Sequence, residues 1–214
     1  MKPAIYVISG LGTDGRVFKG IKIKGIRFQF LKWLAPKSGE SLSVYAERFS
    51  KQIKTKSPRL IGISFGGILA IEISKILPLK KLILISSIKT RAEMPPLFQL
   101  ISKIKWMESL IIWLICRITW PAPWFFGATK YARLLKQILK DTNQTLLSWS
   151  IHQILHWKNI KPPRMATHIH GDTDRIFPSQ YTKHIHEIKK GGHFMIMENA
   201  SEISALLNSV LPKT

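Results

Sequence analysis

Short apolar segments alternate with stretches of helical periodicity along most of this chain, and this alternation restricts the possible folds more than any other feature. The expected strands cover residues 4–8, 26–31, 59–63, 82–85, 165–170 and 184–188, and the expected helices include 41–53, 66–77 and 200–211. Strands that alternate with helices indicate a parallel sheet, and continuously apolar strands are typical of a sheet buried on both faces. The sequence therefore predicts an α/β fold with about six parallel strands and helices on both faces.

Residues 90–160 interrupt this rhythm between the fourth and fifth expected strands. The segment has helical periodicity and holds six of the seven tryptophans, of which Trp106 and Trp113 share one helical face with Leu110. Pro121 and Pro123 should separate two helices, because proline interrupts the helical hydrogen-bond ladder. We predict a single domain over residues 1–214 with a helical cap at about 90–160, in which some tryptophans line an apolar substrate pocket.

The charge balance is strongly basic. The 33 Lys and Arg outnumber the 12 Asp and Glu and give a formal net charge of +21, which attracts anionic partners. The cations are scattered rather than gathered in a tail, and no nucleic-acid-binding motif is present, so we expect a basic solvated surface with weak attraction to anionic surfaces and no specific nucleic-acid site. A lone cysteine, Cys116, the lack of a signal-peptide pattern and the lack of a transmembrane segment lead us to expect a cytoplasmic protein.

A serine lies at a glycine-rich junction between an expected strand and an expected helix. Residues 62–66 read Gly-Ile-Ser-Phe-Gly, a G-x-S-x-G pattern, with Ser64 at its centre. In this context the turn is sharp, the small glycines avoid clashes, and the serine hydroxyl stands above the end of the sheet. The backbone N–H of Phe65 then points toward a reacting carbonyl. The pattern predicts a nucleophilic serine; the alternative is a Gly-Ser-Gly turn without chemistry.

Such a serine needs a base, and the base needs a carboxylate to orient it. Among the seven histidines, His193 stands out because it occupies a glycine-flanked loop just after the last expected strand. Asp172 and Asp174 both follow the fifth expected strand, at the sheet edge where α/β sites form. Either aspartate gives the chain order Ser, Asp, His.

These segments together resemble the α/β-hydrolase fold superfamily, specifically a small serine esterase or acyl hydrolase. The resemblance covers nearly the whole chain, through residues 9–18, 62–67, 170–178 and 191–194. It implies that Asp174 is the triad acid and that the oxyanion-hole donors are the backbone N–H groups of Leu11 and Phe65. The sequence departs from the family in having Ser9 where a histidine often precedes the oxyanion-loop glycine, in lacking the N-terminal antiparallel strands, and in the short interval between Asp174 and His193.

We therefore expect a hydrolase that cleaves a carboxylic ester or thioester of an apolar acyl group, without a cofactor or metal. Acyl transfer, C–C bond hydrolysis or a lyase step by the same triad are alternatives, and a non-catalytic basic protein that binds anionic partners is another.

Two other patterns suggest different chemistry. His152 and His156 are one helical turn apart, as two metal ligands would be, but the sequence shows no cysteine or carboxylate nearby to complete a site. The glycines at 10, 12 and 15 have dinucleotide-loop spacing, but residues 27–34, which span the second expected strand, contain no acidic residue to bind a ribose.

Overall fold

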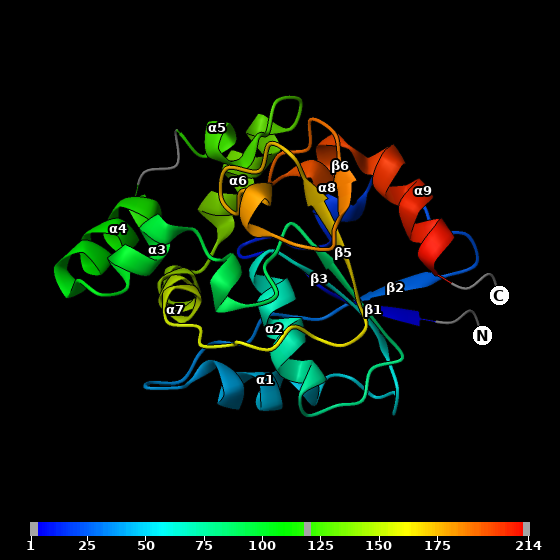
Figure 1. The fold of residues 1–214 in the computed structure, drawn as a ribbon, viewed down its shortest axis with the longest axis horizontal. Helices are drawn as coiled ribbons and strands as arrows, with labels where there is room; N and C mark the ends of the chain where they lie inside the picture. Colours follow the sequence, from blue (N-terminus) through cyan, green and yellow to red (C-terminus); the bar gives the residue numbers. More distant parts are fainter. Residues whose placement is uncertain (1–3, 118–120, 212–214) are drawn as a thin grey trace.

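A computed structural model describes residues 4–117 and 121–211. Its centre is a six-stranded sheet in the order β2-β1-β3-β4-β5-β6, in which all neighbouring strands are parallel (Figure 1). The strands are β1 (Ala4–Ile8), β2 (Arg27–Phe30), β3 (Arg59–Ile63), β4 (Lys81–Ile85), β5 (Ala166–Gly171) and β6 (His186–Ile188). The predicted α/β fold with six parallel strands is confirmed.

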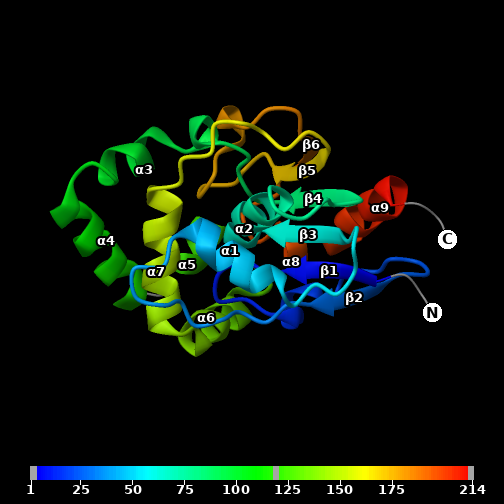
Figure 2. The ribbon, with the colours of Figure 1, turned by 90° about the horizontal axis from the view of Figure 1, so that it is seen from below.

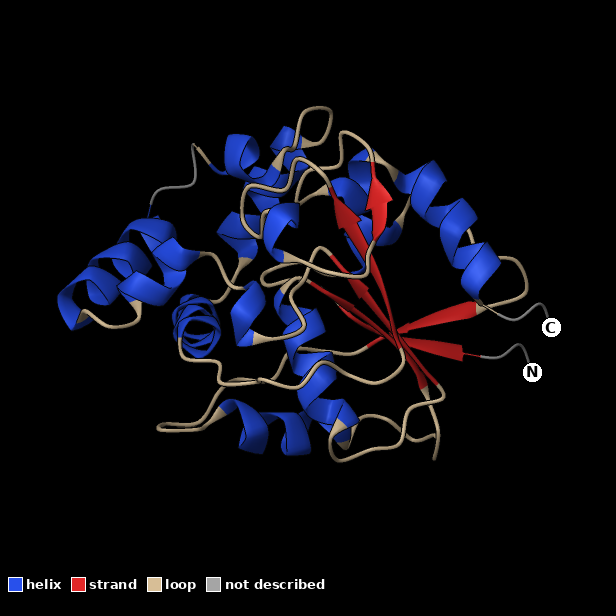
Figure 3. Ribbon diagram, viewed as in Figure 1, coloured by secondary structure: helices blue, strands red, loops and turns tan. Residues whose placement is uncertain are grey.

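Helices cover both faces of the sheet. One face carries α1 (Leu42–Ser50) and α2 (Phe65–Ser74), and the other carries η1 (Gly15–Phe18), α8 (Met195–Glu198) and α9 (Ala200–Val210) (Figure 3). Successive strand residues point to opposite faces, so Ile5 and Val7 pack in one core cluster while Tyr6 and Ile8 pack in the other. This double burial explains why the strands are apolar without interruption.

In the described part of the chain, five α-helices lie between β4 and β5 in the sequence, and they stand beyond one end of the sheet (Figure 2). They are α3 (Pro96–Ile101), α4 (Lys105–Arg117), α5 (Ala122–Phe126), α6 (Ala132–Asp141) and α7 (Gln144–Leu155). The expected Pro-rich turn between two helices is instead the start of α5: Pro121 is its N-cap and Pro123 lies in its first turn, where proline is tolerated because the first N–H groups have no helical acceptor. Two further 3-10 turns, η2 (Arg91–Glu93) and η3 (Ser179–Tyr181), follow β4 and β5 in the sequence.

The tryptophans that the structure describes do not line the expected pocket, and Trp120 lies outside the described residues. Trp106, Trp113 and Trp124 are exposed at 68%, 52% and 61% of their surface. Trp149 and Trp157 instead pack at the sheet side of the inserted helices, where their indole N–H groups bind the Glu40 carbonyl and the Glu72 carboxylate. Among the described residues, none of the tryptophans lines the cavity beside Ser64, so that expectation was wrong.

The order of the strands brings the carboxyl ends of β1 and β3 together at a position where a site can form. β1 lies between β2 and β3, so the chain winds in opposite directions on either side of it, and parallel α/β sheets bind ligands outside the carboxyl ends of their strands at such a point. Ile8 at the end of β1 pairs in register with Gly62 near the end of β3. The glycine loop after β1 and the Ser64 turn after β3 therefore emerge side by side.

Candidate functional site

Ser64 occupies a strained turn between β3 and α2. Its φ of 51° and ψ of −123° are unusual for a residue with a side chain. Two hydrogen bonds hold the turn: the Ser64 N–H donates to the Ile85 carbonyl at 2.9 Å, and the Ser87 hydroxyl donates to the Ser64 carbonyl at 2.8 Å. Bonds from the neighbouring strand β4 and its following loop thus fix the backbone that presents the Ser64 hydroxyl.

The glycines around Ser64 are required by close backbone approach. A Cβ on Gly62 would lie 2.5 Å from the Gly66 carbonyl oxygen, and one on Gly66 would lie 2.4 Å from the Ser9 carbonyl oxygen. A Cβ on Gly67 would meet the Ser87 hydroxyl at 2.4 Å. No side chain fits at these distances, which gives the physical reason for the G-x-S-x-G spacing read from the sequence.

The structure brings Ser64, His193 and Asp174 into one hydrogen-bonded chain. The Ser64 Oγ lies 2.8 Å from His193 Nε2, and His193 Nδ1 lies 2.8 Å from Asp174 Oδ2. A carboxylate only accepts, so Nδ1 carries the proton and Nε2 is left to accept from the serine hydroxyl. The edges of Phe126 and Phe177 pack against the His193 ring, with centroids 5.3 and 5.6 Å away. The ring is therefore fixed in tautomer and in orientation.

Asp174 is buried but well supplied with donors. Its second oxygen, Oδ1, accepts the backbone N–H groups of Ile176 at 2.8 Å and Phe177 at 2.9 Å. Burial raises the pKa of Asp174, but the interactions with His193, with His170 and with the Phe177 N–H outweigh burial and hold that pKa below its usual value. The carboxylate therefore remains charged near neutral pH. Asp172, the other candidate, has no hydrogen bond to His193.

A second histidine, His170, contacts the same carboxylate, and the sequence analysis did not assign it a role. His170 Nε2 donates to the Phe177 carbonyl at 2.7 Å and lies 3.5 Å from Asp174 Oδ2. Its Nδ1 lies 3.2 Å from Nε2 of His168 on the same strand. Burial lowers the pKa of both His168 and His170. These neutral rings support the loop that carries Asp174, and only the H-G-x-x-D spacing hinted at that role.

The loop after β1 lies beside Ser64. A Cβ on Gly10 would be 3.6 Å from the Ser64 Cβ, which is ordinary van der Waals contact, so this loop lies directly against the serine. The Ser9 hydroxyl donates to the Thr13 carbonyl, and the Thr13 hydroxyl and N–H both bind the Gly10 carbonyl, which closes the turn. Within the described residues, the N–H of Leu11 donates to no backbone carbonyl. Phe65 opens α2, where N–H groups have no acceptor in their own helix.

This loop does not open a dinucleotide-binding helix. Gly15 begins the four-residue 3-10 turn η1, so the glycines are not directly followed by the α-helix that a dinucleotide-binding loop opens. Gly10 and Leu11 instead line a cavity together with Ser64 and His193.

That cavity has a volume of about 550 Å³ and apolar walls. The side chains come from the sheet edge and from the inserted helices, with α4 supplying Ile111, Leu114 and Ile115. Among the described residues of the lining, Arg175 is the only ionisable one apart from His193; its guanidinium lies 4.3 Å from the Trp124 ring centroid. Such a cavity accommodates an apolar group next to the serine hydroxyl.

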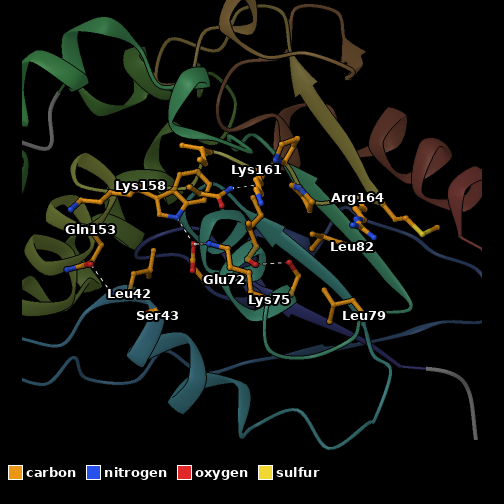
Figure 4. Close-up of a pocket in the computed structure, with 18 of the residues that line it drawn as sticks. Leu42, Ser43, Glu72, Lys75, Leu79, Leu82, Gln153, Lys158, Lys161 and Arg164 are labelled. Carbon is orange, nitrogen blue, oxygen red and sulfur yellow. Dashed lines mark hydrogen bonds and ion pairs between the residues drawn. The ribbon is translucent and has the colours of Figure 1, made fainter.

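A larger cavity, of about 880 Å³, lies beside α1, α2 and the start of β4 (Figure 4). Lys75, Lys158, Lys161 and Arg164 surround it, and Glu72 is held there by Lys75 at 2.6 Å and by the Trp157 indole N–H at 2.7 Å. It contains neither Ser64 nor His193, so the apolar cavity is the better candidate for chemistry.

The structure corrects one expectation about the histidines of the inserted helices. Glu108 on α4 lies against both His152 and His156 on α7, so a carboxylate does complete their cluster. Glu108 is 44 positions from His152 in the sequence, which is why the local pattern did not show it.

The comparisons with known proteins agree with this architecture. Residues 36–206 match the model of the alpha/beta hydrolase family. The chain belongs to the alpha/beta hydrolase family. It is therefore an enzyme of the α/β-hydrolase type, as the sequence resemblance implied.

Solved structures similar to this α/β hydrolase differ in their chemistry. A hydrolase from Pseudomonas aeruginosa PA01 is 14% identical with a TM-score of 0.70, over 97% of this chain and 89% of that one. An epoxide hydrolase from Bacillus megaterium is 13% identical with a TM-score of 0.68, over 97% and 92%. An esterase from Exiguobacterium antarcticum is 15% identical with a TM-score of 0.65, over 98% and 92%. These likenesses show the fold alone, and no curated protein matches the α/β hydrolase described here.

Proposed function

We propose that this α/β hydrolase is a serine hydrolase that cleaves a carboxylic ester or thioester of an apolar acyl group. The observation that carries the proposal is the continuous hydrogen-bonded chain Ser64–His193–Asp174, which ends at an apolar cavity. An activated serine, a base and an orienting carboxylate are the parts that acyl transfer to serine requires.

In the first half of the reaction, Ser64 Oγ attacks the acyl carbon while His193 Nε2 takes the hydroxyl proton. The Leu11 and Phe65 N–H groups bind the oxyanion that develops on the carbonyl oxygen, a contribution of roughly 3 kcal/mol for each donor. His193 then gives its proton to the departing alcohol or thiol. The charged Asp174 stabilises the imidazolium between these two transfers.

In the second half, water hydrolyses the acyl-enzyme. His193 removes a proton from the water, the resulting tetrahedral intermediate collapses, and the proton returns to Ser64 Oγ. The products are the free carboxylic acid and the regenerated enzyme. No cofactor enters either half.

The walls of the cavity support the apolar substrate class. Residues of α4 and α7 face residues of the sheet edge, and most of the described side chains that line the cavity are apolar. We propose that α3–α7 act as a cap that covers the acyl group. Burying each methylene of that group stabilises the complex by about 0.8 kcal/mol, so affinity should rise with acyl length until the cavity is filled.

The surface of α4 supports an anionic, lipid-like partner. Trp106, Leu110 and Trp113 are exposed on one face of that helix, and the Arg117 guanidinium lies 5.7 Å from the Trp113 ring centroid. Aromatic and basic side chains on one helical face favour the boundary of a membrane that carries negative charge. In the described part of the chain, no helix is long and apolar enough to cross a bilayer. The single cysteine supports a cytoplasmic location.

The reaction is tested with a panel of esters and thioesters of increasing acyl length, incubated in ¹⁸O-labelled water. Hydrolysis predicts one labelled oxygen in each acid product, faster turnover of the more apolar acyl groups, and no turnover by Ser64→Ala. An exposed serine provides the matched control, so Ser209→Ala should behave as wild type. If the acyl group passes to an added alcohol in preference to water, the reaction is acyl transfer and the proposed hydrolysis is wrong. Turnover that survives in Ser64→Ala would overturn the proposed role of the serine.

A further inference from the structure

Two inserted helices bring together a side-chain cluster that the reaction at Ser64 does not use. Helices α4 and α7 lie side by side (Figure 2). His152 on α7 and His156, the C-cap of that helix, meet Glu108 of α4. One ligand atom from each of the three residues lies within 4.8 Å of the other two. Side chains from two different helices therefore meet at one point.

The pairing geometry points one nitrogen of each ring at the same carboxylate. His152 Nδ1 is 2.5 Å from Glu108 Oε1, and His156 Nε2 is 2.9 Å from Glu108 Oε2. The two imidazole rings are 4.5 Å apart. Their tautomers can exchange, so a metal ion that replaces the two shared protons finds two nitrogens and a carboxylate already gathered.

The charge at this point is suited to a cation. Glu108 is 8% exposed, and within the described part of the chain the two histidines are the only basic side chains at ion-pair distance from it. The carboxylate is therefore largely buried against two imidazole rings, each of which binds one of its oxygens.

We propose that Glu108, His152 and His156 form a binding site for a zinc-like divalent transition-metal ion. Two imidazole nitrogens and one carboxylate match zinc, whereas calcium and magnesium prefer oxygen ligands throughout. The His152 and His156 side chains are 51% and 39% exposed, so an ion enters from solvent and keeps a water molecule in its fourth position.

The ion would clamp α4 to α7 at the outer end of the apolar cavity. Ile151 and Leu155 precede the two histidines on α7 and line that cavity, as do Ile111 and Ile115 on α4. The site lies outside the Ser64 cavity, and metal binding does not depend on the proposed reaction. The ion is thus a structural clamp on the cavity walls.

The test is a calorimetric titration of ZnCl₂ into full-length protein that has been treated with chelator and carries no affinity tag. We expect one zinc per chain for wild type, and affinity at least roughly tenfold lower in Glu108→Gln, His152→Asn and His156→Asn. The double variant His184→Asn/His186→Asn removes two exposed histidines elsewhere and should bind as wild type does.

Cobalt provides a second readout that does not involve activity. Co²⁺ bound to two nitrogens, a carboxylate and water should give visible d–d absorption in wild type and not in Glu108→Gln, which keeps the size of the side chain and its ability to hydrogen-bond. Circular dichroism establishes that each variant is folded. No zinc binding by folded wild type, or equal binding by folded Glu108→Gln and both single histidine variants, would overturn the proposal.

Discussion

At the scale of single residues, the site depends on which nitrogen of His193 carries the proton. Asp174 Oδ2 accepts a hydrogen bond from Nδ1 at 2.8 Å, which places the proton on Nδ1. The N–H groups of Ile176 and Phe177 hold the carboxylate through its other oxygen. Every member of the chain is therefore positioned by at least two contacts.

Replacing Asp174 with asparagine should disable the site while leaving the fold intact. The amide can donate to Nδ1, which favours the tautomer that carries its proton on Nε2 and cannot accept from Ser64, and a loss of roughly 10⁴-fold in kcat is expected. The initial rate on a chromogenic ester measures the effect. Asp172→Asn is the matched control and should retain activity close to wild type; equal losses in the two variants would contradict the assigned role.

Buried neutral histidines should make the fold sensitive to acid. Burial lowers the pKa of His168 and of His170, so below about pH 6.5 the unfolded chain binds protons that the folded chain does not. The free energy of unfolding should therefore rise with pH through this window and be lost as the pH falls, by up to about 1.4 kcal/mol per pH unit for each histidine.

Urea denaturation at pH 7.5 and 5.5, values chosen at about one unit to either side of the histidine pKa, measures this dependence. His168→Gln should show a smaller pH dependence than wild type, whatever its stability at the higher pH. An unchanged dependence in the variant would show that the His168 imidazole is not the group that titrates on unfolding.

At the scale of elements, the turn between β3 and α2 is the most demanding part of the chain. A Cβ on Gly62 would lie 2.5 Å from one backbone oxygen and 2.6 Å from the Gly67 Cα. Gly62→Ala should therefore lower the free energy of unfolding by about 1–3 kcal/mol and also displace Ser64.

Gly15→Ala is the matched comparison for that substitution. The nearest atom to its new Cβ is in the Phe30 ring at 3.4 Å, which is ordinary contact, so both stability and ester turnover should stay near wild type. Thermal unfolding and initial rates measure both variants. A fully active and stable Gly62→Ala would show that the turn can relax.

The sequence predicted those elements whose signals are local. β1 and β3 have the predicted bounds, because a continuous apolar run followed by glycines reports a buried strand and its end. β6 starts at His186 rather than at residue 184, because His184 has a φ of 51°, which is not a strand conformation. The sequence pattern did not predict this positive φ.

Contacts between distant segments could not be predicted in the same way. Glu108 reaches His152 and His156 only after α4 packs on α7, and Trp157 is held by Glu72, 85 positions earlier. The tryptophan pattern was read as a pocket lining because helical spacing reports a shared face but not what that face contacts. Periodicity alone cannot separate an exposed aromatic face from a buried one.

At the scale of the whole molecule, charge and exposed apolar surface act together. The net charge is +21, and the exposed face of α4 carries Trp106, Leu110 and Trp113. We predict binding to vesicles that contain anionic lipid and little binding to neutral vesicles, with affinity that falls as salt rises.

Co-sedimentation with vesicles measures this binding. Trp106→Ser/Trp113→Ser should weaken it, whereas Val44→Ser, which removes an exposed apolar side chain from α1 on the sheet, should not. Equal binding by the tryptophan variant and wild type would leave charge alone as the attraction and would contradict a role for the α4 face.

The central claim is that Ser64 is a nucleophile activated by His193 and Asp174, and labelling with a fluorophosphonate probe tests it most directly. Intact mass after labelling should show a single adduct on wild type, and none on folded Ser64→Ala or His193→Ala. Absence of an adduct on folded wild-type protein, or an adduct that persists in Ser64→Ala, would contradict the account.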